Sequence, residues 1–217
     1  MRQYGARRYA WYTVVLLTVA YIFSFIDRYI LGLLVEPIKS DLGLSDTQIG
    51  LLLGPAFALF YTTMGLPLGW LADRARRTWI IGAGITVWSL ATAACGLARS
   101  FGQLFAARVS VGVGEASLSP CALSMIADAF PEERRGKPVA FYSATLTLGA
   151  GIASLAGASV LAWSKSVPGI ELPGVGQVAP WQFAFIAVGL PGIPLAVLMF
   201  FLREPVRQDL ATIGADG

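Results

Sequence analysis

The stretch Gly69-Trp-Leu-Ala-Asp-Arg-Ala-Arg-Arg77 decides the fold, because it joins two long apolar runs through a very short charged turn. The first run ends in an acid, Asp73, and a basic cluster follows at once. Arginines at this point lie near the C-terminus of the first helix, where the helix dipole favours positive charge. The stretch therefore predicts two helices that are connected by a basic turn.

Apolar runs of similar length recur on both sides of this turn, and the bilayer is therefore the solvent from which to reason. The chain is 56% hydrophobic and 13% charged, whereas about a quarter of the residues in a soluble domain are charged. A helix needs about 20 apolar residues to cross a bilayer, and no run has the alternating pattern of a barrel strand. Six spans are predicted, approximately at Trp11 to Val35, Ile49 to Leu71, Thr78 to Ala98, Phe101 to Phe130, Pro138 to Trp163 and Ala179 to Leu202. The predicted fold class is an all-α, polytopic membrane protein.

The positive charges predict the orientation. Eleven of the 16 lysines and arginines fall on one side, namely Arg2, Arg7, Arg8, Arg74, Arg76, Arg77, Arg134, Arg135, Lys137, Arg203 and Arg207. The positive-inside rule then places both termini in the cytoplasm, and we expect the membrane to be a bacterial inner membrane. The basic pI near 9.0 follows from this asymmetry, and no nucleic-acid partner is expected.

Cysteine and histidine usage excludes several kinds of site. Cys95 is predicted near the outer end of its span and Cys121 in the inner half of the next, so a disulfide is not expected and both should be packing residues. The chain has no histidine, which removes His-based metal sites and Ser-His catalysis. No metal, cofactor or catalytic residue is expected, and carboxylates remain as the groups that titrate.

Four ionisable residues lie inside the predicted spans: Asp27 and Arg28 in the first, Arg108 and Glu115 in the fourth. Such groups are costly in hydrocarbon and usually face a bundle interior or a water-filled pathway. Arg108 and Glu115 are seven residues apart, on one helix face about 10 Å apart along the axis. Small residues between them, including Gly112, are expected to leave room for solvent or ligand. The four charges form either an ion-pair network that only pins helices together or a substrate and proton site.

Two motifs resemble the major facilitator superfamily. The turn at 69–77 resembles its G-x-L-A-D-R-x-G-R-R/K signature, with Arg76 where the family usually has glycine. The order Arg108-x-x-x-Gly112-x-Gly114 resembles the pattern of its fourth span, whose arginine is associated with proton coupling. The spinster-like branch is suggested by further strings, namely Asp27-Arg28, Trp88-Ser89, Val111 to Ser117 and Ile126 to Phe130. No Gly-Pro signature of antiporters is evident in the fifth span, so the direction of transport stays open.

The resemblance implies a secondary active transporter that works by alternating access and draws on a proton gradient. Its implied substrate is an amphipathic or anionic small molecule of the lysolipid or sphingolipid kind; another organic anion or a drug-like compound is the alternative. Asp27 is the expected proton carrier, Glu115 a second titrating or arginine-holding group, and Arg28 and Arg108 the bases that face the anion. A gate is expected at Gly69, Asp73, Arg74, Arg77, Asp128, Arg134 and Arg135, with Asp73 and Arg134 or Arg135 as a latch.

The resemblance also implies that the six spans are one half, the N-terminal one, of a 12-helix fold. Residues 1–10 are then a cytoplasmic tail, 11–203 the six-helix bundle, and 204–217 the start of the central cytoplasmic loop. The expected partners are the substrate, protons, the bilayer and a C-terminal half, supplied by a longer chain or by a second copy. Two rival functions stay open: a non-transporting membrane scaffold or sensor, and an intramembrane enzyme, which the lack of histidine disfavours.

Overall fold

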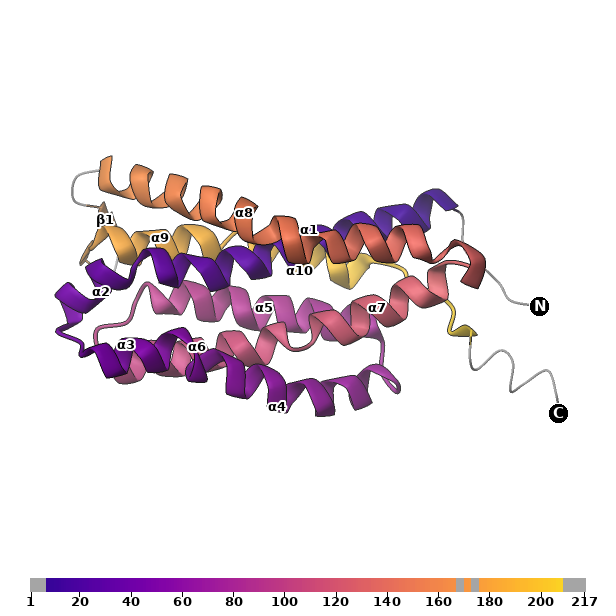
Figure 1. Cartoon of the computed structure of the whole chain (residues 1–217), viewed down its shortest axis with the longest axis horizontal. Helices are drawn as coiled ribbons and strands as arrows, with labels where there is room; N and C mark the ends of the chain where they lie inside the picture. The colour runs from indigo at the N-terminus through magenta and orange to yellow at the C-terminus, as the bar shows by residue number, and fades with distance from the viewer. Residues whose placement is uncertain (1–6, 167–169, 173–175, 209–217) are drawn as a thin grey trace.

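The computed structural model describes residues 7–166, 170–172 and 176–208, and its helices form a bundle of six spans, each running opposite to the span before it (Figure 1). The helices are α1 (Arg7–Leu33), α2 (Val35–Leu42), α3 (Asp46–Leu53), α4 (Pro55–Ala72), α5 (Arg77–Cys95), α6 (Phe101–Glu115), α7 (Leu118–Ala129), the short 3-10 helix η1 (Glu132–Arg134), α8 (Gly136–Ser166), α9 (Pro180–Gly189) and α10 (Gly192–Phe201). The six predicted spans are confirmed, each within several residues of its predicted ends.

Three spans are broken. Span 2 breaks between α3 and α4 at Gly54, span 4 between α6 and α7 at residues 116–117, and span 6 between α9 and α10 at residues 190–191. Pro55 occupies the first turn of α4, where its missing N–H removes no helical hydrogen bond. In the sequence, Gly65 and Pro67 predict a bend in span 2, and Gly189, Pro191 and Pro194 predict one in span 6. Span 6 does break there, whereas α4 continues through Pro67 without a break.

Spans 1 and 5 pack through a face of small residues on α8. Gly149, Ala153 and Gly157 are spaced four apart on this helix, and Ala153 is fully buried. A methyl group on Gly157 would lie 2.7 Å from a Leu33 methyl carbon, which is too close for a van der Waals contact. Small residues let membrane helices approach in this way, so this face of α8 serves close packing against α1.

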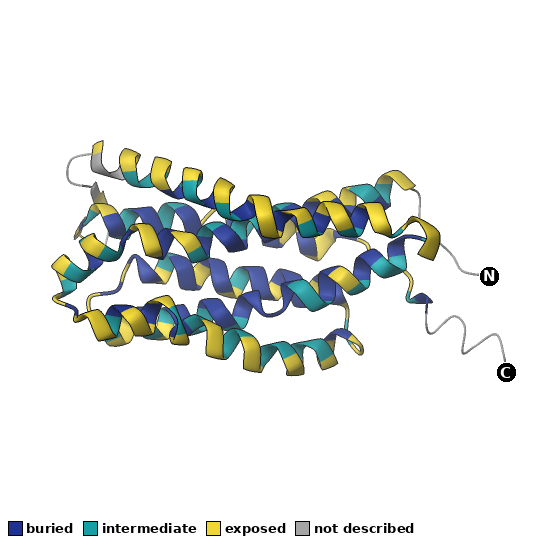
Figure 2. Ribbon diagram, viewed as in Figure 1, coloured by how far each residue is buried: buried dark blue, intermediate teal, exposed yellow. Residues whose placement is uncertain are grey.

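Burial is uneven among the spans. About 61% of the most apolar window of span 3 is buried within the bundle, against 17% for span 2 and 22% for span 5. Figure 2 shows the corresponding exposed surfaces on α4 and α8, at opposite edges of the bundle. Spans 1, 3 and 4 thus supply most of the buried interior, and spans 2 and 5 present apolar surface outward.

The bundle has one strongly basic end. Figure 1 shows that the start of α1, the segment after α10, the α4–α5 turn and the α7–α8 turn lie at the same end. We call the start of α1, residues 73–77, residues 130–135, the first turn of α8 and residues 202–208 the basic end. It carries ten of the 16 lysines and arginines: Arg7, Arg8, Arg74, Arg76, Arg77, Arg134, Arg135, Lys137, Arg203 and Arg207.

The long connector before span 6 contains a short hairpin at the opposite end of the bundle. Strand β1 (Ile170–Leu172) pairs antiparallel with β2 (Gly176–Val178), and Ile170 lies opposite Val178. Two strands of three residues are too small to be stable alone. The buried Val178 side chain anchors the second strand to the bundle.

Candidate functional site

Spans 1 and 4 bring Arg28 and Glu115 together. The Glu115 Oε2 atom accepts a hydrogen bond from Arg28 Nε at 2.6 Å and another from Ser24 Oγ at 2.6 Å. Ser24 and Arg28 are four residues apart, so both project from one face of α1. The Glu115 side chain has no exposed surface and that of Arg28 is 24% exposed. In this ion pair the carboxylate is fully buried and the arginine side chain is partly exposed.

Asp27 and Arg108 meet through the backbone. Arg108 Nη1 donates to the Asp27 carbonyl oxygen at 3.1 Å, and both residues are only 2% exposed. The Asp27 carboxylate oxygen Oδ1 is buried and has no hydrogen-bond partner among the described residues, and the same is true of Glu115 Oε1 and Arg108 Nε. Unpaired buried polar atoms are costly. The buried charges therefore retain hydrogen-bonding capacity that a proton, a water or a bound ligand could use.

Aromatic rings of α4 cover the basic side chains. The Arg28 guanidinium lies 4.7 Å from the centre of the Phe57 ring and 4.8 Å from that of Tyr61. Arg108 lies 5.7 Å from the centre of the same Phe57 ring. An arginine at these distances is attracted to the ring face. Span 2 therefore contributes to the site by holding the two guanidinium groups against rings.

The glycines of span 4 do not leave room for solvent or ligand, and this expectation was wrong. A methyl group on Gly112 would lie 2.7 Å from the Phe57 carbonyl oxygen, and one on Gly114 would lie 2.8 Å from both the Gly84 carbonyl oxygen and the Trp88 nitrogen. The space beside each glycine is filled by the backbone of a neighbouring span. Their function is close packing, which brings α6 against α4 and α5.

The break in span 4 lies beside Glu115, the last residue of α6. The next helix, α7, begins at Leu118 after two intervening residues. Discontinuous helices are a recurring feature of ion and substrate sites in transporters. The break thus places a buried carboxylate at a point where the helix is interrupted near the middle of the span.

At the basic end, Arg77 joins three segments. Its Nη1 atom lies 2.5 Å from Asp128 Oδ2 at the end of α7, and its Nε lies 2.9 Å from Glu204 Oε1, just after α10. The same guanidinium donates to Ser124 Oγ at 2.7 Å. Only 2% of the Arg77 side chain is exposed. The first residue of α5 is therefore fixed by a buried ionic network.

The other predicted gate residues have separate contacts. Asp73 ends α4, and its carbonyl oxygen accepts a hydrogen bond from Arg207. Arg74 stacks on the Trp70 ring with 4.0 Å between the guanidinium carbon and the ring centre. Arg135 donates to the Phe130 carbonyl oxygen at 2.8 Å.

The structure does not assemble the predicted latch. No hydrogen bond or ion pair joins Asp73 to Arg134 or Arg135 within the described part of the chain. Gly69 meets no neighbouring atom that would exclude a side chain. Of the predicted gate residues, Arg77 and Asp128 are in direct contact.

Comparisons with known proteins give the family. The chain matches the family model of the Major Facilitator Superfamily over residues 17–215. This chain belongs to the major facilitator superfamily. It is 35% identical over 96% of its length to an MFS-type efflux pump of Mycolicibacterium smegmatis, and 34% identical over 89% to a probable L-galactonate transporter of Escherichia coli. It covers 44% and 40% of those two proteins.

The likeness to the spinster-like branch is also confirmed. The protein spinster of Drosophila melanogaster is 26% identical over 92% of this chain. The crystal structure of a bacterial homologue of the human lysosomal transporter Spinster, inward-facing and unoccupied, superposes with a TM-score of 0.83 at 37% identity. That match covers 94% of this chain and 45% of the solved one. The six spans are thus one half of a major facilitator fold, and the chain spans less than half the length of these relatives.

Several residues of this major facilitator half were missed in the sequence. Ser24 could have been found from its four-residue spacing to Arg28, and Phe57 and Tyr61 from the same spacing in span 2. Glu204 is an acid that follows span 6 on the side where basic residues gather, and this contrast was its only signal. No group of three or more metal-ligating side chains occurs in the residues that the structure describes.

Proposed function

We propose that this chain is one half of a secondary transporter that moves an amphipathic or anionic small molecule by alternating access, coupled to protons. The observation that carries the proposal is the group of four charges on α1 and α6, three of them buried and the fourth, Arg28, partly exposed. Each of the two spans contributes one guanidinium group and one carboxylate, and few hydrogen bonds link the four residues. Buried ionisable residues in a membrane are a functional-site hypothesis by default.

The unpaired atoms favour a working site over a network that only pins helices. A structural ion-pair network is stable when its members are fully hydrogen-bonded, whereas Asp27 Oδ1, Glu115 Oε1 and Arg108 Nε have no such partner among the described residues. We propose that Asp27 carries the proton, because its carboxylate is buried and free of a direct ionic partner. Glu115 would hold Arg28 in the resting state and release it when an anionic group enters.

The proposed substrate has an anionic or zwitterionic head, which Arg28 and Arg108 would face. Phe25, Phe57 and Tyr61 surround Arg28 and could contact an apolar tail. Likeness to spinster proteins supports a lysolipid or sphingolipid-like molecule. Likeness to a probable L-galactonate transporter supports a second candidate, a small organic anion without a tail.

The proposed gate lies at the basic end. The buried contacts of Arg77 with Asp128 and Glu204 would stabilise one closed arrangement of α5, α7 and the segment after α10. Asp73 with Arg134 or Arg135 remains part of the proposal for another conformation, since the latch pairs are apart in this one.

The test is transport by the intact protein in liposomes with an imposed pH gradient. We expect flux of radiolabelled lysophosphatidylethanolamine, or of galactonate if the second candidate holds, and we expect Asp27→Asn to abolish the flux that the gradient drives. Glu36→Gln is the matched control, because Glu36 is an exposed carboxylate of the neighbouring α2. A chemically altered product would indicate an enzyme, and the absence of any flux would favour a scaffold. Wild-type flux in Asp27→Asn would refute its role.

A further inference from the structure

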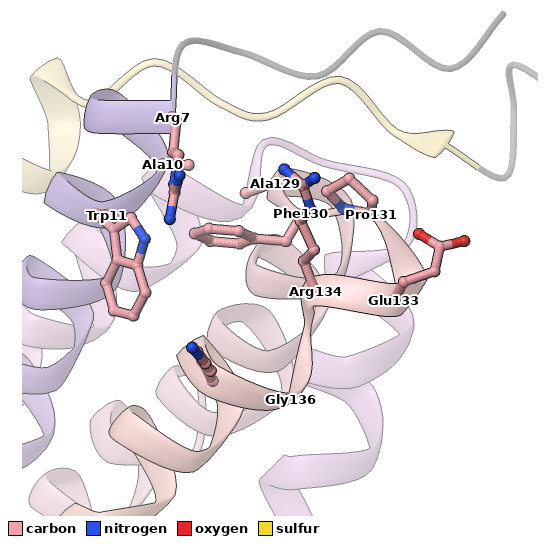
Figure 3. Close-up of a pocket in the computed structure, with 10 residues that line it drawn as sticks. Arg7, Ala10, Trp11, Ala129, Phe130, Pro131, Glu133, Arg134 and Gly136 are labelled. Atoms are coloured by element: carbon pink, nitrogen blue, oxygen red, sulfur yellow. The ribbon is translucent and has the colours of Figure 1, made fainter.

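A cavity of about 660 Å³ opens at the basic end, where α1 and the α7–α8 turn meet (Figure 3). Three segments that are far apart in the sequence contribute to it: the first turn of α1, residues 129–134, and the first residues of α8. The cavity shares no residue with the four charges of spans 1 and 4 or with the ionic network around Arg77. It is therefore separate from the proposed substrate site and from the Arg77 network, and among its lining residues only Arg134 also belongs to the proposed gate.

The charges around this cavity are unbalanced. Arg7, Arg134 and Lys137 line it, against a single acid, Glu133. Figure 3 shows the Glu133 carboxylate pointing away from Trp11 and Phe130, which form the apolar side of the cavity. None of the three basic side chains makes a hydrogen bond or ion pair within the described ranges 7–166, 170–172 and 176–208.

Among the described residues, no neighbouring acidic side chain pairs with Arg7, Arg134 or Lys137. Arg135, in the same turn, faces Glu132 at 3.9 Å and donates to the Phe130 carbonyl oxygen. It is therefore engaged within the turn itself. The excess positive charge on the cavity belongs to Arg7, Arg134 and Lys137, which are exposed and accessible to an anion.

The floor of the cavity is aromatic. Trp11 packs edge-on against Phe130, with ring centres 5.7 Å apart, and against Phe141 at 6.0 Å. Tryptophan in this position, at the end of a membrane span, is typical of the level of the lipid headgroups. The cavity thus combines an apolar floor with a basic rim at the place where the span leaves the hydrocarbon.

We propose that this cavity binds a phosphate-bearing anion, either the headgroup of an anionic phospholipid or a soluble phosphate ester. Basic pockets between membrane helices are known sites for anionic headgroups, and guanidinium groups pair with phosphate through two parallel hydrogen bonds. Helix α8 begins at the cavity, so its N-terminal dipole adds to the attraction for negative charge. Arg7 and Arg134 bind the phosphate oxygens, Lys137 adds a third positive charge, and Trp11 and Phe130 contact the apolar part of the ligand.

The test is a binding titration of the intact, delipidated protein in detergent, read by native mass spectrometry. The probes are dioctanoyl phosphatidylglycerol and glycerol 3-phosphate, with dioctanoyl phosphatidylcholine as the zwitterionic reference lipid. Removing two charges in the double variant Arg134→Gln/Lys137→Gln should weaken phosphatidylglycerol binding roughly 25-fold. Arg8→Gln removes one charge from an exposed residue that neighbours Arg7 but does not line the cavity, and it should change the affinity far less.

A second measurement does not depend on the double variant, so it tests the proposal even if that variant fails to fold. The fluorescence of Trp11, isolated as the difference between the wild type and Trp11→Phe, should respond to the bound probe in the unaltered cavity. Competition by glycerol 3-phosphate would identify a soluble phosphate ester as a ligand, and binding of phosphatidylglycerol without such competition would identify a lipid. Wild-type affinity in the folded double variant, or no binding of either anionic probe, would overturn the proposal.

Discussion

At Gly112 the backbone of α6 lies so close to α4 that a methyl group has no room. We predict that Gly112→Ala destabilises the bundle by about 1–3 kcal/mol, the usual cost of inserting a methyl group into a packed interface. Thermal unfolding in detergent is the measurement. Gly102→Ala is the matched control on the same helix, because no atom lies within 4 Å of the added carbon, and alanine there should be neutral or stabilising by up to about 1 kcal/mol. Equal melting temperatures for the two variants would contradict the packing argument.

The buried charges could be predicted from the sequence, but their contacts could not. Asp27, Arg28, Arg108 and Glu115 are conspicuous because ionisable residues are rare in apolar spans. Which of them pair depends on how α1 and α6 are rotated toward each other, and the spacing along one helix gives no information on this. The glycine at 112 illustrates the same limit, since a small residue indicates either a void or a close approach and only the neighbouring span decides.

At the scale of elements, Arg77 holds the start of α5 to the ends of α7 and α10. Its two carboxylate partners are largely buried, with 11% of the Asp128 and 16% of the Glu204 side chain exposed. We predict that Arg77→Gln costs about 3–5 kcal/mol, as is typical when one partner of a buried ion pair is removed. The loss should appear in thermal unfolding, and as faster amide hydrogen exchange in the first turn of α5.

The adjacent Arg76 provides the control for this prediction. It is exposed and lies 5.5 Å from the centre of the Trp79 ring. Arg76→Gln makes the same change of charge one residue away, so its effect on unfolding should be much smaller. If both variants unfold alike, the basic character of the turn, and not the buried network, stabilises this end of the bundle.

The number and order of the spans could be predicted, and so could the break in span 6, where Gly189, Pro191 and Pro194 indicate a bend. The breaks in spans 2 and 4 could not. Hydropathy averages over a whole window, so it locates span 2 without detecting the interruption at Gly54. Gly65 and Pro67 predict a bend in the same span, yet α4 continues there because a proline removes only one backbone donor and the rest of the helix remains hydrogen-bonded. The hairpin at 170–178 escaped prediction for a different reason, since three-residue strands carry almost no periodic signal.

At the scale of the whole molecule, most of spans 2 and 5 faces outward and is apolar. Exposed large side chains include Leu59 and Leu66 on α4 and Leu148 and Leu155 on α8. In a bilayer, either lipid tails or another six-helix half can cover such surfaces, because association of helices in membranes depends on packing and not on a hydrophobic driving force. Exposure alone therefore gives no count of the spans in the working protein.

The share of each relative that this chain covers predicts the mass of the intact protein. The chain covers 44% of the efflux pump and 45% of the spinster homologue that it matches, and a transport path between two halves requires the second half. We predict that the protein extracted from its native membrane has an intact mass about twice the 23.1 kDa of this chain, as expected for two fused six-helix halves. Denaturing mass spectrometry is the measurement, because it separates a longer chain from a dimer. A mass of 23.1 kDa would mean that two copies of this chain must assemble, and the four charges of α1 and α6 would then occur twice, on either side of one symmetric pathway.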